Sequence, residues 1–366
     1  MLMDKKDKKL KIAVIGTGGI SNCHLAGYKN NPNTEIYALC DINRARAEQK
    51  AKAYGVPDER VFEDKDEMLA KLPEIDAVSV CTWNSQHAPC TIAALKAGKD
   101  VLCEKPMAMN AKEAKAMKAA ADKAGKLLMI GFVRRHGNDA KIVKDFADTG
   151  YFGDLYYTKA TYLRRNGNPG GWFGDKSRSG GGPLIDLGVH VIDLVRYLIG
   201  LPKPVSVFGA TFHKLGNRPD VKGTKAYLAS DASSADKDIC DVEDLASAMI
   251  RFDNGAVLSV EASFSLNLKG DVGNIELFGD KAGAKLSPEL TLYTNVNGYM
   301  VDIGFHDSTA LSFGDLFQNE INHFVDCVLG KAKCIAPAED GVILMKILDA
   351  IYKSAATGHE VRISQD

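Results

Sequence analysis

The sequence predicts an α/β protein with a doubly wound parallel sheet in its N-terminal part and an open, mostly antiparallel sheet in its C-terminal part. Three observations predict this fold class. Apolar, strand-like runs alternate with helix-like runs up to about residue 133. A glycine-rich turn follows the first apolar run. Beyond residue 133 the pattern changes to alternating segments rich in β-branched and aromatic residues, which is typical of antiparallel strands.

The change of pattern divides the 366-residue chain into two predicted domains, residues 1–133 and 134–366, because a chain of this length exceeds one ordinary hydrophobic core. In the first domain we expect strands and intervening helices. The strands are expected at 11–16, 35–40, 76–82, 100–103 and 127–132. The helices are expected at 19–30, 43–54, 65–71, 86–97 and 110–124.

The second domain is expected to begin with a helix at 138–149 and to end with helices at 314–329 and 339–356. Its strands are expected at 154–163, 204–214, 244–252, 255–265 and 273–278. The dipeptide Asn254-Gly255 between two of them predicts a hairpin. The polar segment 215–238 is expected to form a long loop.

The turn after the first strand is typical of dinucleotide binding. Gly16 permits a tight turn, and Gly18 lets the backbone approach a pyrophosphate because it has no Cβ. The helix that begins beyond Gly19 and Ile20 directs free N–H groups at that anion. Ser21 stands where the full pattern has a third glycine. A tight turn in another kind of α/β protein is the alternative.

Asp41 follows the second apolar run at the distance expected for an acid that binds the ribose. Its carboxylate would accept hydrogen bonds from the ribose diol and repel a 2′-phosphate, which favours NAD over NADP. Arg44 and Arg46 follow it, and we interpret them as solvated helix residues. NADP stays possible if either arginine binds a 2′-phosphate.

Ligands of doubly wound sheets bind beyond the carboxyl ends of the strands. Four further residues at such ends are expected to contact the cofactor: Thr82, Asn84, His87 and Glu104. Lys105 follows Glu104 and precedes Pro106, a pair that marks a turn and sometimes a cis peptide bond. A lysine held there contacts the cofactor and can favour a substrate alkoxide by its positive charge. The alternative is a surface lysine.

A glycine run at Gly180–Gly182, which would let the backbone approach a ligand, precedes a predicted helix that carries Asp186, His190 and Asp193. Spacings of four and three residues place these side chains on one helix face if the helix is continuous. Histidine suits proton removal near neutral pH, so His190 is the candidate general base and Asp186 a binding or orienting group. Two alternatives stay open: a structural histidine paired with Asp193, and a metal site at Asp186 and His190 that lacks an evident third ligand.

The sequence resembles the glucose–fructose oxidoreductase/inositol dehydrogenase family, often called Gfo/Idh/MocA, over nearly its whole length. The matching positions are Gly16–Gly19, Asp41, Thr82–Asn84, His87, Glu104–Pro106, Gly180–Pro183, Asp186, His190 and a closing helix over 338–354. Trp83 replaces a proline usual in the family. The resemblance implies a Rossmann domain, an α/β domain whose open sheet commonly mediates homo-oligomers, and NAD(P)-dependent oxidation or reduction of a sugar or cyclitol carbon. It also implies that Lys105, Asp186 and His190 are catalytic and contact the substrate.

Three further residues look suited to binding a polyol: Arg135, Arg164 and Trp172. An indole can stack on the apolar face of a sugar, and arginines can bind its hydroxyl groups. Trp172 is equally suited to packing or to a subunit contact. His323 lies on an amphipathic helix and is expected to be structural.

Composition excludes several classes of protein. The net charge of −1 gives no reason to expect nucleic acid or an anionic membrane as partner. No apolar stretch approaches a membrane span, and the basic start over 1–11 is interpreted as a solvated tail. The eight cysteines form no Cys-x-x-Cys pair and several fall in apolar runs, which favours a reducing cytoplasm. We expect no bound metal.

The leading hypothesis is an NAD-dependent dehydrogenase that acts on a secondary carbinol carbon of a sugar, cyclitol or glycoside. His190 would take the hydroxyl proton while Lys105 polarises the oxygen. One alternative is oxidation of a glycoside at C3 with tightly bound NAD, leading to cleavage of the aglycone. A second alternative, from another class, is a non-catalytic dinucleotide-dependent regulator.

Overall fold

The computed structural model describes residues 9–218, 220–222, 228–229, 231–232, 239–306 and 312–365. Residues 1–8 of the predicted tail and most of the predicted loop at 215–238 lie outside these ranges. The chain forms two compact units. Unit 1 contains the described residues up to Ala108, together with Lys112–Val133 and Ser312–Val342. Unit 2 contains Met109–Ala111, the described residues from Arg134 to His306, and residues from Ile343 onward.

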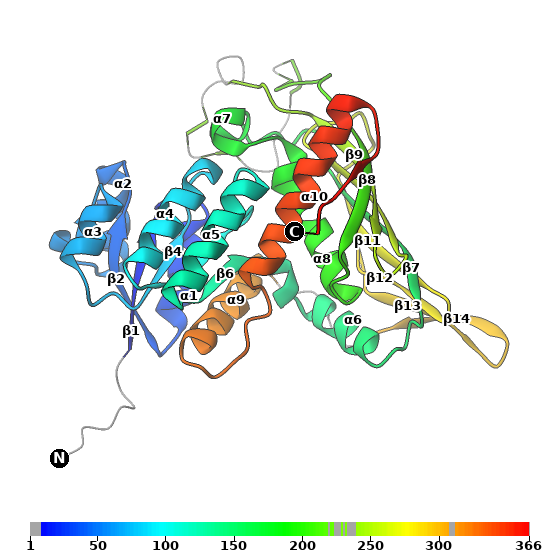
Figure 1. Cartoon of the computed structure of the whole chain (residues 1–366), viewed down its shortest axis with the longest axis horizontal. Helices are drawn as coiled ribbons and strands as arrows, with labels where there is room; N and C mark the ends of the chain where they lie inside the picture. The colour runs from blue at the N-terminus through cyan, green and yellow to red at the C-terminus, as the bar shows by residue number, and fades with distance from the viewer. Residues whose placement is uncertain are drawn as a thin grey trace. The chain divides into compact units, whose positions relative to one another are not determined.

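Unit 1 is built on a parallel sheet with the strand order β3-β2-β1-β4-β5-β6 among the described residues (Figure 1). The strands are β1 (Leu10–Ile15), β2 (Thr34–Cys40), β3 (Val61–Phe62), β4 (Ala77–Val80), β5 (Asp100–Glu104) and β6 (Leu128–Gly131). The order reverses direction between β1 and β4, which is the topological switch point where such sheets bind ligands.

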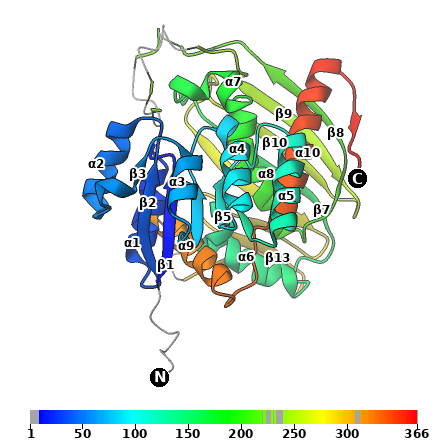
Figure 2. The ribbon, with the colours of Figure 1, turned by 60° about the vertical axis from the view of Figure 1, so that its left-hand side comes forward.

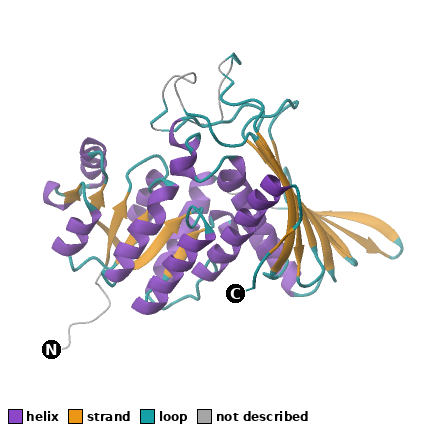
Figure 3. Ribbon diagram, turned by 45° about the horizontal axis from the view of Figure 1, so that its top comes forward, coloured by secondary structure: helices purple, strands orange, loops and turns teal. Residues whose placement is uncertain are grey.

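Helices connect these strands and flank the sheet (Figure 3). They are α1 (Ser21–Asn30), α2 (Arg44–Tyr54), α3 (Lys65–Lys71), α4 (Asn84–Lys96) and α5 (Ala111–Ala124). Crossovers between parallel strands are right-handed as a rule, so those on either side of the switch point place their helices on opposite faces of the sheet. Helix α9 (Phe313–Val328) packs against α1, where Gly27 leaves room for the side chain of Ile321.

The core of unit 1 is apolar on both faces of its sheet, as a fully covered parallel sheet requires. Val14, Leu25, Leu39, Ala47 and Cys81 belong to one buried cluster. Four of the cysteines in this unit are buried and pack as small hydrophobic residues: Cys40, Cys81, Cys90 and Cys103.

Unit 2 is built on a nine-stranded sheet, counted over the described residues, with the order β14-β13-β12-β11-β7-β10-β9-β8-β15. Its strands are β7 (Leu155–Leu163), β8 (Pro204–Phe212), β9 (Leu245–Phe252), β10 (Val257–Ser263), β11 (Val272–Gly279), β12 (Ala282–Lys285), β13 (Thr291–Val296), β14 (Tyr299–Gly304) and β15 (Val361–Arg362). Each pairing between described strands of this sheet is antiparallel except that of β7 with β10. The predicted fold class is therefore confirmed.

Helices cover one face of this sheet (Figure 2). Helix α8 (Val189–Leu198) contacts β7 and β10, and α6 (Asn138–Asp148) packs on α8. Helix α10 (Ala338–Thr357) contributes its later turns to unit 2, where the Ser354 hydroxyl accepts the Gly209 N–H of β8 at 2.9 Å. The short helix α7 (Lys176–Ser179) precedes the glycine run.

The predicted strands and helices are found within a few residues of their expected bounds, and β9 and β10 form the predicted hairpin, with Gly255 at φ +86°. Five short strands were not predicted. Two of them, β13 and β14, flank Asn297-Gly298, both at positive φ, which is a hairpin signal that the sequence already contained. The others carry too few residues for a periodic pattern.

Over the described part of the chain, no helix is both long enough and apolar enough to cross a bilayer.

Candidate active site

The turn after β1 has the geometry of a dinucleotide loop. Gly16 has φ +89°, and a Cβ there would lie 2.6 Å from the Cys81 carbonyl oxygen, so only glycine fits. A Cβ at Gly18 or Gly19 would meet no described atom within 4 Å. Ile20 begins helix α1 without a side-chain cap. The loop is thus open on its outer side and leaves N–H groups at the start of α1, which fits a pyrophosphate.

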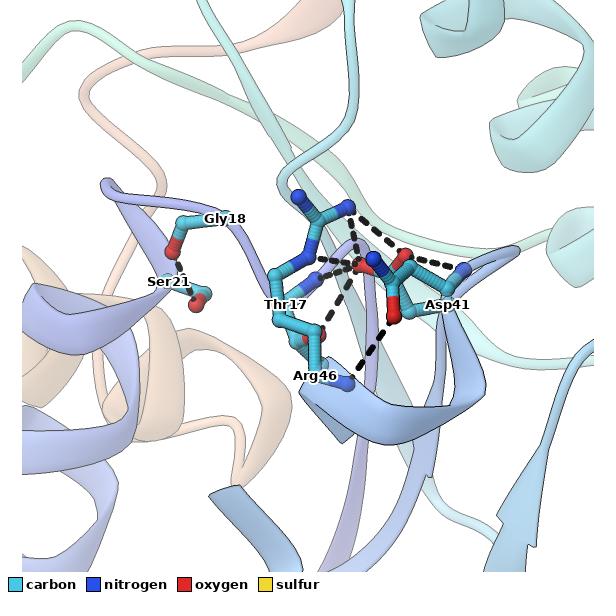
Figure 4. A network of polar contacts seen from close by, with 6 residues as sticks. Thr17, Gly18, Ser21, Asp41 and Arg46 are labelled. Carbon is cyan, nitrogen blue, oxygen red and sulfur yellow. Dashed lines mark hydrogen bonds and ion pairs between the residues drawn. The ribbon is translucent and has the colours of Figure 1, made fainter. Parts of the chain in front are cut away.

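Ser21 occupies the position of the third glycine in the loop and stabilises the turn there. Its hydroxyl donates a 2.6 Å hydrogen bond to the Gly18 carbonyl oxygen, and the residue is fully buried (Figure 4). The side chain thereby closes the turn on itself.

Asp41 lies at the end of β2 and is almost completely buried. One carboxylate oxygen accepts the Thr17 N–H at 2.6 Å and the Thr17 hydroxyl at 2.9 Å, and the other accepts the Asn43 N–H at 2.8 Å (Figure 4). Burial alone would raise the pKa of Asp41, but hydrogen bonds from Arg46, Asn43 and Thr17 outweigh it and lower that pKa. The carboxylate is therefore held ionised beside the glycine loop.

The interpretation of both following arginines as solvated residues is wrong for Arg46. Its guanidinium binds Asp41 with a nitrogen–oxygen distance of 2.7 Å, and its side chain is only 28% exposed. Arg44 is a solvated helix residue, 45% exposed and paired with Glu48. Both arginines lie in the first turn of α2, where the Arg46 guanidinium contacts the Asp41 carboxylate and that of Arg44 contacts Glu48.

His87 ties together the loops that follow β4 and β5. One ring nitrogen lies 2.7 Å from the Pro106 carbonyl oxygen and the other 3.1 Å from that of Thr82. Burial lowers the pKa of His87, although both carbonyl oxygens oppose that shift. A neutral imidazole has one N–H, so His87 donates to one of these carbonyl oxygens and contacts the other, between Thr82 and the Lys105-Pro106 turn, whose peptide bond is cis. Asn84, buried in the first turn of α4, belongs to the same edge of the sheet.

Glu104 carries a buried hydrogen-bond chain that sequence reasoning missed. One carboxylate oxygen lies 2.8 Å from His24 Nε2, and the other accepts the Lys105 N–H at 3.1 Å. The other ring nitrogen of His24 lies 3.2 Å from the Ser79 hydroxyl, which is 2.6 Å from the Tyr28 hydroxyl. The chain joins α1, β4 and β5 behind the backbone of Lys105.

Glu320 on α9 completes this cluster. It is fully buried, and its ligand atom lies within 4.8 Å of those of His24 and Glu104. Neither carboxyl oxygen has a hydrogen-bond partner among the described residues. Burial, followed by the charge of Glu104, raises the pKa of Glu320 well above its usual value, so the group is held as a neutral acid. No sequence pattern marks Glu320, because only tertiary packing of α9 on α1 brings it there.

In unit 2, the segment that carries Asp186 and His190 is a π-helical turn (Leu184–Gly188) followed directly by α8. The helix is thus not a continuous α-helix as the spacing argument assumed. Asp186 is buried in the π-turn, and His190 is half-buried in the first turn of α8. π-turns widen a helix locally and are frequent at functional sites.

The structure pairs Asp193 with Arg135. The guanidinium donates two hydrogen bonds to the carboxylate, at 2.6 and 2.9 Å, and both side chains are buried. The Arg135 guanidinium also lies over the Tyr197 ring, 4.8 Å from its centroid. This bidentate pair anchors α8 to the segment before α6.

The glycine run packs tightly against protein. A Cβ at Gly181 would collide with the Tyr352 hydroxyl, and a Cβ at Gly182 with the Glu243 carbonyl oxygen. The Glu243 carboxylate accepts the Gly182 N–H at 2.9 Å, the Leu184 N–H at 3.1 Å and the Tyr352 hydroxyl at 2.8 Å. The expectation that these glycines serve ligand approach is therefore incomplete, because they also let Glu243 fix the start of the π-turn.

The two remaining predicted substrate residues lie in the segment before the glycine run. Arg164 is buried, donates to the Gly167 carbonyl oxygen at 3.2 Å and lies 5.3 Å from the Tyr162 ring centroid. Trp172 is half-buried and stacks on Phe173, with ring centroids 3.9 Å apart.

Comparison with known proteins agrees with this geometry. Residues 10–132 match an oxidoreductase-family model described as an NAD-binding Rossmann fold, and residues 144–363 match the C-terminal alpha/beta domain of the same family. The chain is 35% identical to D-glucoside 3-dehydrogenase of Escherichia coli (strain K12), over 97% of both chains. It is 27% identical to levoglucosan dehydrogenase of Pseudarthrobacter phenanthrenivorans, over 98% of this chain and 99% of that one.

A solved structure of levoglucosan dehydrogenase in complex with NADH superposes with a TM-score of 0.85 at 25% identity, covering 98% of this chain and 100% of that chain. The two family models, the glycine loop and the acid at the end of β2 thus all indicate an NAD-binding oxidoreductase. The chain belongs to the Gfo/Idh/MocA family of oxidoreductases and is an enzyme with an NAD-binding Rossmann domain.

Proposed function

We propose that this enzyme moves a hydride between NAD and a secondary carbinol carbon of a sugar, cyclitol or glycoside, with His190 as general base and Lys105 polarising the hydroxyl. When bound, the nicotinamide supplies the hydride acceptor. The main support is the local setting of the two groups: a lysine whose backbone is fixed by Glu104, and a histidine that directly follows a π-turn.

Lys105 is half-buried and follows the carboxyl end of β5. Its ammonium group would hydrogen-bond the substrate oxygen and stabilise the alkoxide that develops as the hydride leaves. The contact between its own N–H and Glu104 keeps the start of the side chain fixed, so little reorganisation is needed during the reaction.

His190 would accept the hydroxyl proton while Asp186 orients the substrate or the imidazole. The half-buried position of His190 leaves the ring accessible to substrate, while the buried position of Asp186 limits competition from water. The proposal requires the Lys105 ammonium and the His190 imidazole to converge beside the nicotinamide ring.

For the substrate, we favour a pyranoside ring, because a relative at 35% identity is named a D-glucoside 3-dehydrogenase and another a levoglucosan dehydrogenase. Oxidation of a glycoside at C3 with retained NAD, followed by loss of the aglycone, is the second candidate. Oxidation at C3 acidifies the neighbouring C–H bond, which makes elimination possible.

Trp172, Arg164 and Arg135 stay proposed substrate ligands. Trp172 is the strongest of the three, because it is half-buried and its indole could stack on a sugar face. The two arginines already contact other groups of the protein, Arg135 the Asp193 carboxylate and Arg164 the Gly167 carbonyl oxygen, so they rank below Trp172.

The proposed cofactor contacts are the residues at the carboxyl edge of the unit 1 sheet. They are Gly16, Gly18, Gly19, Ile20, Asp41, Thr82, Asn84, His87, Glu104 and Lys105. The ionised Asp41 favours NAD, whereas Arg46 beside it leaves NADP as a possible second cofactor.

We further propose that the chain forms homo-oligomers through the face of the unit 2 sheet that carries Phe208 and Met249. These residues are paired across β8 and β9 and are 53% and 49% exposed. Large exposed apolar side chains side by side are typical of interfaces. We also propose a cytoplasmic location, since buried cysteines serve as ordinary core residues. The functional division into residues 1–133 and 134–366 stays a proposal.

A panel of sugars, cyclitols and glycosides tests the function, with NADH absorbance and product mass recorded together. We expect turnover of at least one pyranose or cyclitol. Mass detection is essential because a redox-neutral cycle returns the cofactor to its starting state. Denaturing the purified enzyme and measuring released NAD(H) separates the two candidates. Failure to convert any member of the panel, while NAD still binds, would overturn the proposal.

A further inference from the structure

Three side chains with soft or borderline metal-ligand atoms meet at the end of helix α9. They are His323, Cys327 and Cys334, and their ligand atoms all lie within 4.8 Å of one another. The Cys327 Sγ is 3.4 Å from His323 Nε2. All three residues are half-buried, so the cluster is organised by the protein and still reachable from solvent. None of them is a proposed catalytic or cofactor residue.

The end of α9 places these groups together. His323 and Cys327 are four residues apart on one helix and so share a face. The chain then reverses at Gly330, which has φ +72°. The N–H groups of Lys331 and Ala332 both donate to the Asp326 carbonyl oxygen, at 2.7 and 3.3 Å. This helix-terminating turn sends the following residues back along α9.

The returning segment is fixed on both sides of Cys334. The Ile130 N–H of β6 donates to the Ala336 carbonyl oxygen at 2.9 Å, and Met129 forms a β-bridge with Pro337. The Ile335 N–H donates to His323 Nε2 at 3.1 Å. Backbone contacts on both sides of Cys334 thus hold this residue over the helix.

We propose that His323, Cys327 and Cys334 form a binding site for a thiolate-preferring metal ion of the Zn²⁺ type. Zinc sites combine cysteine sulfur and histidine nitrogen at about 2.3 and 2.0–2.1 Å, so a tetrahedral site needs ligand edges of about 3.6–3.8 Å. Cys327 Sγ and His323 Nε2 are 3.4 Å apart, close to the shorter of those edges, and each pair of ligand atoms in the cluster lies within 4.8 Å.

The charges of the cluster suit a divalent cation. Two thiolates and a neutral imidazole balance Zn²⁺, and the Asp326 carboxylate acts electrostatically on both His323 and Cys327. The fourth position would be taken by water, since the residues are half-exposed. A bound metal ion would use the lone pair of His323 Nε2, so the Ile335 N–H would lose this acceptor and donate to a thiolate instead. The cost of that exchange limits the affinity for the metal ion. This proposal departs from the expectation of no bound metal and from that of a purely structural His323.

The test uses the purified full-length chain, stripped with a chelator and reduced with a phosphine. Zn²⁺ is titrated against a chromophoric chelator. We expect one Zn²⁺ per chain and an affinity at least about 100-fold lower in the Cys327→Ser/Cys334→Ser double variant. Cys240→Ser removes a half-buried cysteine elsewhere in the chain and is the matched control, expected to bind as wild type does.

A second readout needs no variant. Co²⁺ bound by two thiolates gives sulfur-to-metal charge-transfer absorption, which we expect in the wild-type chain and which Zn²⁺ should abolish by displacement. Three results would overturn the proposal: equal Zn²⁺ affinity in wild type and the double variant, equal loss in Cys240→Ser, or no charge-transfer band. A disulfide between Cys327 and Cys334 that re-forms after reduction, without Zn²⁺ uptake, would identify the cluster as a redox pair instead.

Discussion

The His24 imidazole and the Glu104 carboxylate are joined by a 2.8 Å hydrogen bond, and both are buried. Glu104 also accepts the backbone N–H of Lys105, so this contact links helix α1 to the proposed catalytic lysine. The neutral acid Glu320 lies beside the pair. The hydrogen bonds of His24 and Glu104 fix the geometry of this buried network, and the buried Glu320 carboxyl makes stability depend on pH.

The pH dependence is tested by Glu320→Gln. Above about pH 4.5, the usual pKa of this carboxyl, the unfolded chain loses the proton that the folded chain keeps. The free energy of unfolding of wild type therefore falls as pH rises, by up to ~1.4 kcal/mol per pH unit from this group. The glutamine variant should lack that loss, so its stability relative to wild type should increase from pH 5 to pH 8. Urea denaturation at both pH values measures the difference, and a constant offset would contradict a neutral Glu320.

Cofactor preference should depend on the Asp41–Arg46 pair. Asp41→Ala removes the proposed ribose acceptor and releases the guanidinium, so the ratio of NADP to NAD affinity should rise by about tenfold or more. Adding Arg46→Ala should cancel the gain in NADP affinity. Arg44→Ala is the control, since Arg44 is solvated and pairs with Glu48. Fluorescence titration with each cofactor measures the two affinities. Equal losses of NAD and NADP affinity in Asp41→Ala would argue against a role of Asp41 in ribose binding.

The proposed catalytic pair is tested by Lys105→Ala and His190→Ala. Each should lower kcat by about 10²–10⁴-fold, because alkoxide stabilisation or proton removal is lost. NAD affinity should stay within a few-fold of wild type. Lys71→Ala, an exposed lysine paired with Glu67, is the control and should leave kcat unchanged. Wild-type turnover in both variants would remove the assignment.

Breaking the Arg135–Asp193 pair should destabilise the chain strongly. Asp193→Ala leaves the buried guanidinium without its carboxylate, and we expect a loss of about 3–5 kcal/mol in the free energy of unfolding. Arg135→Ala should cost a similar amount, and the two losses should not add. Asp145→Ala, which removes an exposed pair with Lys141, should cost less than ~1 kcal/mol. Additive losses in the double-mutant cycle would show that the pair is not coupled.

A substitution in the glycine run Gly180–Gly182 tests whether its tight packing is needed for stability and for turnover. Gly182→Ala places a Cβ against the Glu243 carbonyl oxygen, so we expect a loss of about 1–3 kcal/mol and a lower kcat, because the π-turn with Asp186 shifts. Gly273→Ala meets nothing within 4 Å of the new Cβ and should be nearly neutral in kcat. Calorimetry measures the stability of both variants, and steady-state kinetics measures their kcat. A stable, fully active Gly182→Ala would show that the run tolerates side chains.

The sequence by itself determined the fold class, the glycine loop and the acid at the end of β2, because period-2 and period-3.6 patterns and a glycine at positive φ are local properties. Only the tertiary structure decided which partners these groups take. Arg46 binds Asp41, Asp193 binds Arg135, and Glu243 holds the glycine run. The clusters around Glu320 and Cys334 likewise bring together residues far apart in sequence or on either side of a chain reversal. Such contacts depend on how helices and loops pack, which no local pattern encodes.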